Sequence, residues 1–218
     1  MSESATTLDT GPVPAAGVPR STRERVVRAA ARLFLARSYQ SVGVNEICSL
    51  AQVQKGSFYH FFPSKSDLVM AVIDHHAAVM WASLDRHERA ARGPANKIRA
   101  IAEVVDESQR ALVKSFGRAV GCPLGNLAVE LATTEDAAGK HAAAVFARLE
   151  ERVAGHCWDA AEVGQLAPGV DPDDLAHRII ATMEGMILLA KVSDSDVGAV
   201  PVAIHQVIDA ALARSSAA

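Results

Sequence analysis

Apolar residues recur every three to four positions along most of this 218-residue chain, a spacing that predicts amphipathic α-helices. Strand signals are nearly absent, since no turn dipeptide separates two alternating runs. A first helix is predicted to start near residue 21 and to bury one face, made of Val26, Ala30, Leu33 and Phe34. Two short helices follow, at residues 44–51 and 54–62. Pro63 separates them from a fourth helix, which Ser64 can cap.

Beyond residue 93 the same pattern predicts five further helices, at about residues 96–114, 124–133, 136–158, 172–191 and 200–214. The sequence therefore predicts an all-α fold of about nine helices. A three-helix N-terminal domain (residues 21–66) precedes a larger C-terminal helical domain (residues 67–218). Residues 1–20 are rich in Ser, Thr, Ala, Gly and Pro, a composition typical of a disordered leader.

Composition excludes several classes of protein. No apolar run approaches the roughly 18 residues that a membrane-spanning helix needs, so no membrane contact is predicted. The chain has three cysteines, at widely spaced positions and without a Cys-x-x-Cys pair, which argues against a disulfide scaffold or a structural zinc site. We therefore expect a cytoplasmic protein.

The charge is unevenly distributed, although the net charge of the chain is only −3. Residues 20–66 contain eight Lys or Arg against two acids, a net charge of +6, whereas residues 67–218 carry −7. A basic N-terminal domain on an acidic body is expected where only one end of a protein meets nucleic acid.

The N-terminal domain has the pattern of a helix-turn-helix, two short helices joined by a tight turn and braced by a preceding helix. On the third helix the apolar residues Val53, Phe58 and Phe62 can pack inward. The outward positions carry hydrogen-bonding side chains, namely Lys55, Ser57, Tyr59 and His60. This helix is predicted to lie against a polyanion.

In two strings the chain closely resembles the TetR family of bacterial transcriptional regulators. They are Ser-Val-Gly-Val-Asn-Glu-Ile at residues 41–47 and Lys-Gly-Ser-Phe-Tyr-His-Phe-Phe-Pro-Ser-Lys at residues 55–65. The resemblance implies a DNA-binding head and a helical effector-binding and dimerisation bundle. It also implies a homodimeric repressor that grips a palindromic double-stranded DNA operator and is released by a small-molecule effector, with no cofactor.

The resemblance assigns DNA-contact roles by position. Base readout falls to Gln54, Lys55 and Ser57, and phosphate contact to Arg23, Tyr59, His60 and Lys65. Gly56 leaves room for close approach, and Gly43 and Val44 begin the second helix near the DNA. Phosphate contacts set the register of the protein on the duplex, whereas base-edge contacts set its sequence preference.

Three positions depart from the family pattern. Gly43 stands where Ser or Thr usually caps the second helix and touches phosphate, so the side-chain contact is lost. Ser38 and Gln52 stand where glycine is usual, so positive φ angles are expected there, at a cost of about 1 kcal/mol each.

Effector binding is expected between helices of the C-terminal domain, where bundles place ligand sites. The predicted lining residues are large or flexible apolar side chains, namely Met80, Trp81, Val104, Leu112, Phe116, Cys122, Phe146 and Met183. Plain core packing is the alternative interpretation of each one.

Gly-Cys-Pro at residues 121–123 precedes a predicted helix and places Cys122 near its N-terminus, where a thiolate is stabilised. A similar Gly-Cys-x-x-Gly-Asn string occurs in a subset of TetR-type regulators, some of which sense electrophiles through a cysteine. Cys122 is therefore a candidate reactive sensor, and the alternative is a small buried side chain that holds the loop.

Two apolar stripes near the C-terminus predict the dimer interface. The first consists of Leu175, Ile179, Met183, Met186 and Ile187, and the second of Ile204, Val207, Ile208, Ala211 and Leu212. By the family resemblance they build a four-helix seam around a twofold axis.

No catalytic or metal site is predicted. Neither a Gly-x-Ser-x-Gly elbow nor a Walker-type loop is present, and the adjacent His75 and His76 point apart on a helix. Two alternatives to an effector-released repressor remain open. One is an electrophile- or redox-sensing repressor of the same fold, acting through Cys122. The other is a helical interaction module without specific DNA binding.

Overall fold

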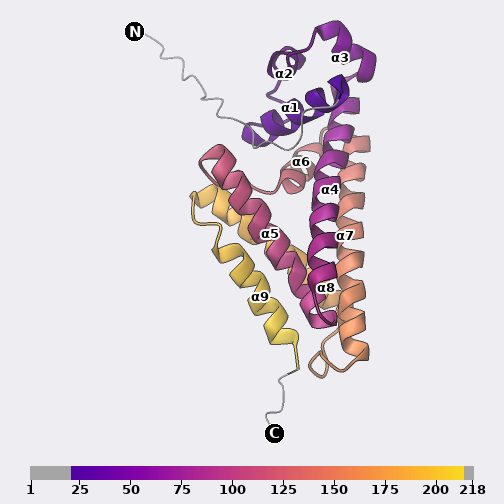
Figure 1. Ribbon diagram of the computed structural model, residues 1–218, viewed down its shortest axis with the longest axis vertical. Helices are drawn as coiled ribbons and strands as arrows, with labels where there is room; N and C mark the ends of the chain where they lie inside the picture. Colours follow the sequence, from indigo (N-terminus) through magenta and orange to yellow (C-terminus); the bar gives the residue numbers. More distant parts are fainter. Residues whose placement is uncertain (1–20, 214–218) are drawn as a thin grey trace.

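The computed structural model describes residues 21–213, so the predicted leader at residues 1–20 lies outside the described residues. Within the described range the chain forms nine helices and no strand (Figure 1). They are α1 (Thr22–Ala36), α2 (Val44–Ala51), α3 (Lys55–Phe61), α4 (Lys65–Ala90), α5 (Pro94–Phe116), α6 (Pro123–Leu131), α7 (Asp136–Glu162), α8 (Pro172–Ser193) and α9 (Ala199–Ala211). The predicted all-α fold is confirmed.

Local sequence accounts for most helix ends. Ser21 and Ser64 accept hydrogen bonds from the third amide of α1 and α4, and the acids at those third positions, Glu24 and Asp67, complete capping boxes. Proline occupies the first turn of α5, α6 and α8, where a missing N–H costs nothing. These signals lie within a few residues of each helix end, so the sequence predicted most helices closely.

The molecule is elongated, with α1–α3 at one end and the long helices α4 and α7 side by side along its length (Figure 1). We call α1–α3 the head and the remainder the body. The first turns of α4 still pack on the head, because Leu68, Val72 and Ile73 belong to its core. Head and body are therefore joined by one continuous helix.

Two apolar clusters fill the interior. The upper core combines the buried faces of α1–α4 with the start of α7 and α6, through Ala138, Ala142, Leu124, Leu127 and Leu131. The lower core combines α5, α7, α8 and α9 with Leu84 of α4. Three half-buried side chains pack against both cores, namely Met80, Cys122 and Phe146. We call this place the junction.

Most residues of the predicted dimer stripes pack within their own protomer. Most of them are buried in the lower core of their own protomer, namely Leu175, Ile179, Met183, Ile187, Ile204, Ile208 and Ala211. Met186, Val207 and Leu212 are half-buried against the same core. The fully buried members pack α8 against α7 and α9 within the chain, which leaves those side chains no surface for a second copy.

A different apolar face of α8 and α9 is exposed. Leu189 and Val192 are 59% and 74% exposed, and Leu188 and Val202 are also exposed. In helical order Leu189 and Val192 are three positions apart, which places them on one face. None of the nine described helices is both long and apolar enough to cross a membrane.

Candidate nucleic-acid interface

Helix α3 divides cleanly into a buried and an exposed side. Phe58 has no exposed surface and Phe62, just after the helix, is nearly as buried, so the two rings anchor α3 to the upper core. Tyr59 is 46% exposed, and Lys55 and His60 are exposed beside it. Burial of the two phenylalanines therefore forces the polar residues of the helix outward.

The turn between α2 and α3 has the strained backbone that the sequence predicted. Gln52 has φ 54° and ψ 49°, in the left-handed region. The Arg25 guanidinium, reaching across from α1, donates to the carbonyl of Ala51 at 3.0 and 2.6 Å and to that of Gln52. These bonds satisfy carbonyls at the end of α2 and fix the turn. Ser38 does not have a positive φ, so that expectation was wrong.

The other predicted contact residues on or near α3 lie at its start. Gln54 and Gly56 are exposed and Ser57 is half-buried. A Cβ atom built on Gly56 would have no heavy atom within 4 Å, so the backbone there is open to close approach. Arg23 of α1 lies near the opposite end of α3, its guanidinium 5.3 Å from the ring centroid of Phe62, the residue that follows the helix.

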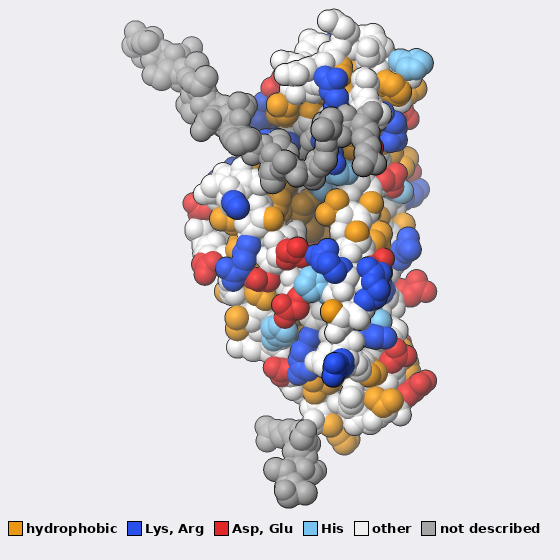
Figure 2. All heavy atoms as spheres, viewed as in Figure 1, with side chains coloured by type: hydrophobic (Ala, Val, Ile, Leu, Met, Phe, Trp, Pro, Cys, Tyr) orange, Lys and Arg blue, Asp and Glu red, His pale blue; other side chains and the backbone are white. Residues whose placement is uncertain are grey.

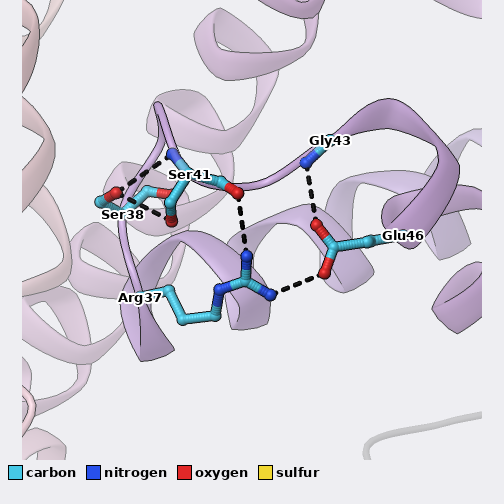
Figure 3. Close-up of polar contacts among 5 residues, drawn as sticks. All are labelled: Arg37, Ser38, Ser41, Gly43 and Glu46. Carbon is cyan, nitrogen blue, oxygen red and sulfur yellow. Dashed lines mark hydrogen bonds and ion pairs between the residues drawn. The ribbon is translucent and has the colours of Figure 1, made fainter.

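The amino end of α2 is capped by a side chain from within the helix (Figure 3). The Gly43 amide donates to Glu46 Oε2 at 3.0 Å, and Glu46 Oε1 lies 2.6 Å from Arg37 Nη1. Val44 is half-buried. The Gly43 hydrogen bond and the Arg37 ion pair hold the pKa of Glu46 below its ordinary value. Sequence reasoning missed Arg37 and Glu46, although a Glu three residues after a helix cap is the spacing of a capping box.

Lys65, the first residue of α4, turns back toward the protein. Its ammonium lies 4.2 Å from the ring centroid of Tyr39, which is buried between head and body. Burial lowers the pKa of Lys65, and the carboxylates of Glu130 and Glu135 counteract part of that effect. In this conformation the side chain is held at the contact between head and body.

Two carboxylates of the body bind the head directly. Glu130 of α6 accepts the backbone amides of Tyr39 and Gln40 at 2.9 and 2.7 Å. Glu135, before α7, accepts the hydroxyls of Tyr39 and Ser66 at 3.0 and 3.1 Å. Burial and the bond to Glu135 raise the pKa of Tyr39 well above its ordinary value. The loop after α1 is thus hydrogen-bonded to both ends of the α6–α7 connection. These contacts join residues far apart in the sequence, so no local sequence pattern predicts them.

Comparison with known proteins identifies this architecture. The family model for "Bacterial regulatory proteins, tetR family" matches residues 26–72, and that for "Tetracyclin repressor-like, C-terminal domain" matches residues 94–206, more than half of the chain. The chain belongs to the TetR family. It is a helix-turn-helix transcriptional regulator that binds DNA, as the sequence predicted.

Several TetR-family relatives match most of the chain. The transcriptional regulator AcuR of Cereibacter sphaeroides is 31% identical over 77% of this chain and 75% of its own length. An uncharacterised regulator of Lactococcus lactis is 30% identical over 80% of this chain and 85% of its own length. A solved TetR regulatory protein from Rhodobacter sphaeroides is 28% identical, covers 87% of this chain and 96% of its own, and has a TM-score of 0.73. The reduced form of Escherichia coli NemR shares the fold, with a TM-score of 0.74, 21% identity and coverage of 90% and 100%.

The structure separates the predicted effector-lining residues. Met80, Cys122 and Phe146 each pack against both cores, whereas Val104 and Met183 are buried in the lower core. Two others lie beneath arginine side chains, Trp81 under Arg148 at 5.0 Å and Phe116 under Arg32 at 4.9 Å. Leu112 is half-buried on α5.

The expectation that Cys122 carries a stabilised thiolate is wrong. Cys122 does cap α6, and its sulfur accepts the Gly125 amide at 3.2 Å. Burial and the neighbouring carboxyl of Glu184, however, raise the pKa of the thiol well above its ordinary value. The loss of hydration outweighs the helix N-terminus, so the resting side chain is a thiol. Burial likewise raises the pKa of Cys157, to about 12, and that of Cys48.

Two polar residues that were not predicted from the sequence lie close to the junction. Glu184 of α8 hydrogen-bonds to Cys122, and its Oε1 is buried without a hydrogen-bond partner in the described part of the chain. Burial raises the pKa of Glu184. His76, one turn before Met80, has a pKa lowered to about 4 by burial. An acid inside the apolar run after Met183 was the available signal for Glu184.

Lys191 and Asn126 connect α8 to α6. Lys191 Nζ donates to Asn126 Oδ1 at 2.9 Å, and Asn126 Nδ2 donates to the Val120 carbonyl at 2.8 Å. Among residues 21–213, no three His, Cys, Asp or Glu side chains gather closely enough to hold a metal ion.

Proposed function

We propose that the protein is a homodimeric repressor that binds a palindromic operator and is released by a small molecule binding at the junction. Regulators of this family bind DNA and act as dimers with effector ligands. The relatives include DhaR of a Mycobacterium strain and NemR of Escherichia coli, both named as repressors. The role is regulatory rather than enzymatic, and it is carried out in the cytoplasm, where the operator lies.

In the proposed complex α3 lies in the major groove, with Gln54, Lys55 and Ser57 toward the bases. Exposure of Lys55 and Gln54 supports this orientation, as does the burial of the opposite side of the helix. Arg23, Tyr59 and His60 contact phosphates at the edges of the groove. Lys65 joins them once its ammonium leaves the Tyr39 ring.

Two copies place their heads on the two half-sites of the operator. The exposed face of α8 and α9, with Leu188, Leu189, Val192 and Val202, supplies the dimer contact in this proposal. Large side chains with this much exposed apolar surface are expected to be covered by a partner.

Effector binding is proposed at the junction, where Met80, Cys122 and Phe146 each pack against both cores. Figure 2 shows a recess with apolar walls between α4 and α5, just below the head. The buried Glu184 carboxyl next to Cys122 offers an unused oxygen to a hydrogen-bond donor.

Helix α6 connects the junction to the head, and this connection supports the proposed coupling between effector binding and DNA binding. Helix α6 begins at the junction with its cap Cys122, and Glu130 in its last turn accepts hydrogen bonds from the amides of Tyr39 and Gln40. A ligand that displaces the start of α6 therefore displaces the head. The ligand needs only to bind more tightly to the arrangement that does not fit the operator.

A fluorescence-anisotropy titration tests the proposed operator binding. DNA from upstream of the protein's own gene is compared with a shuffled duplex of equal length at near-physiological salt. We expect a preference of about 10³-fold or more. Equal weak binding to every duplex tested, including random fragments of the host genome, would favour the alternative of a helical module without specific DNA binding.

The same assay tests the effector site. Compounds are first screened for release of the wild-type protein from DNA. The active compounds are then tested on Met80→Trp, a substitution outside the head that narrows the junction. We expect this variant to bind DNA as the wild type does and to lose release. Normal release by the variant would place the effector elsewhere.

The second candidate is a repressor that senses electrophiles or oxidants through Cys122. The position of the thiol at the start of α6 favours it, because a bulky adduct there would displace the helix. The raised pKa of the thiol opposes it, since the thiolate is the reactive form. A Cys122→Ala protein that still leaves DNA on treatment with N-ethylmaleimide would eliminate this candidate.

A further inference from the structure

The amino end of α2 carries a carboxylate and a guanidinium that no predicted DNA contact includes (Figure 3). Glu46 binds the Gly43 amide with one oxygen and Arg37 with the other, at 3.0 and 2.6 Å. Arg37 Nη2 also donates to the Ser41 carbonyl at 2.8 Å. Both side chains are well exposed, 38% for Arg37 and 46% for Glu46.

This arrangement poses an electrostatic problem for DNA binding. In a helix-turn-helix the first of the two helices, here α2, crosses the DNA backbone. Gly43 has no side chain with which to contact a phosphate, and the acid that caps the helix in its place is negatively charged. A carboxylate without a counter-charge would repel the phosphates that this end of α2 approaches.

Arg37 neutralises Glu46 and still has hydrogen-bonding capacity to spare. A guanidinium has five N–H groups, and the two bonds described here use one on Nη1 and one on Nη2. A phosphate can therefore bind the same guanidinium while Glu46 and the Ser41 carbonyl keep their bonds. Because the planar group is held at two points, little conformational freedom remains to be lost when a phosphate binds.

We propose that Arg37 is a phosphate-contacting residue at the amino end of α2, and that Glu46 is the positioning residue that orients its guanidinium. The ligand is a backbone phosphate of double-stranded DNA, so the contact adds affinity without sequence preference. The inference rests on the docking of the head proposed above, since it requires the start of α2 to face the DNA.

The experiment measures binding to a random-sequence 30-base-pair duplex by fluorescence anisotropy between 50 and 200 mM KCl. Arg37→Ala is compared with Arg92→Ala, which removes the same charge from an exposed position in the α4–α5 loop. We expect Arg37→Ala to lower the slope of log K against log salt by about 0.9 for each head engaged, and binding to weaken about tenfold per head near 0.1 M salt. Arg92→Ala should leave the slope unchanged.

A second background separates direct contact from simple neutralisation. In Glu46→Gln the acid is absent but the Gly43 amide keeps an acceptor. If Arg37 contacts phosphate, Arg37→Ala in this background still lowers the salt slope. If Arg37 only masks Glu46, the loss disappears in this background, and the proposal is overturned. Equal slopes for Arg37→Ala and Arg92→Ala would overturn it as well.

Two further variants keep the result interpretable. Arg37→Gln removes the charge but keeps a polar side chain. If Arg37→Ala does not fold, the salt slope of Arg37→Gln is compared with that of the wild type instead. Tyr59→Ala tests the docking itself. Weaker binding by Tyr59→Ala with no effect at Arg37 would refute this inference alone, whereas no effect of either variant would refute the docking.

Discussion

The contact between Glu130 and the head gives the most direct test of how the two parts of the molecule are connected. Its carboxylate accepts the amides of Tyr39 and Gln40, which lie 91 and 90 residues away in the sequence. We consider Glu130→Gln, which keeps the size of the side chain. An amide group has a single oxygen, so one backbone N–H loses its acceptor and faces an NH₂ group instead.

The magnitude follows from this geometry. A hydrogen bond to a charged group contributes about 1.5–3 kcal/mol, and water replaces part of the loss because the Gln40 amide is exposed. We therefore expect the local free energy of opening to fall by about 1–2 kcal/mol, since one hydrogen bond is lost and the other becomes neutral. Each 1.4 kcal/mol is a factor of about ten, so exchange of the Tyr39 and Gln40 amides should accelerate roughly 5- to 30-fold.

Hydrogen–deuterium exchange with peptide coverage of residues 37–43 measures this change. Glu162→Gln is the matched control, because it removes the same charge from the exposed last residue of α7. The control should exchange like the wild type throughout the head. Wild-type exchange of residues 37–43 in Glu130→Gln would show that this carboxylate does not hold the head, and the proposed coupling through α6 would fail with it.

Four other variants test the packing of two glycines, the pH dependence of stability and the dimer. Gly125→Ala places a Cβ atom 2.3 Å from Glu184 Oε2 and should destabilise the protein by about 1–3 kcal/mol in thermal melts. Gly56→Ala is the control, because its site is open, and it should raise the stability of the protein by about 0.5 kcal/mol. Because burial raises the pKa of Glu184, the folded state holds this proton more tightly, and the contribution of this group to stability is lost as the pH rises above 4.5. The stability of Glu184→Gln should lack this pH dependence and should exceed that of the wild type near pH 8. Urea denaturation from pH 5 to 8 measures the unfolding free energy of both proteins, and the same pH dependence in both would contradict this role of Glu184. Leu189→Glu should yield a folded monomer in size-exclusion chromatography with light scattering, and an intact dimer would exclude this face of α8 as the contact.

The head could be predicted closely because its structure is encoded locally. The capping serines, the bounds of α2 and the left-handed Gln52 all depend on residues within one or two turns. The burial of Phe58 and exposure of Tyr59 follow from helical periodicity alone. Even here, the ion pair of Arg37 with Glu46 was missed, because it joins two elements across a loop.

The body was predicted as architecture but not as contacts. An apolar stripe such as Leu175, Ile179 and Met183 has the same period whether it packs within a chain or between chains, and the structure places it within. The pKa of Cys122 is raised first by burial and then by Glu184, 62 residues away, so the local position of Cys122 at a helix N-terminus predicted the wrong direction. Lys65 turns inward for a comparable reason, since Tyr39 and the acids near residues 130–135 come together only in the fold.

Helix α4 runs without a break from the head into the lower core, from Lys65 to Ala90. At 1.5 Å per residue its 26 residues make a rod about 39 Å long. Rotation of such a rod by about 5° around its far end moves the near end by about 3.4 Å, which is the rise of one base pair along a DNA strand. The same rotation moves Met80, ten residues and about 15 Å from the far end, by only about 1.3 Å. A small shift of α4 near the junction would therefore move the head by about one base-pair step.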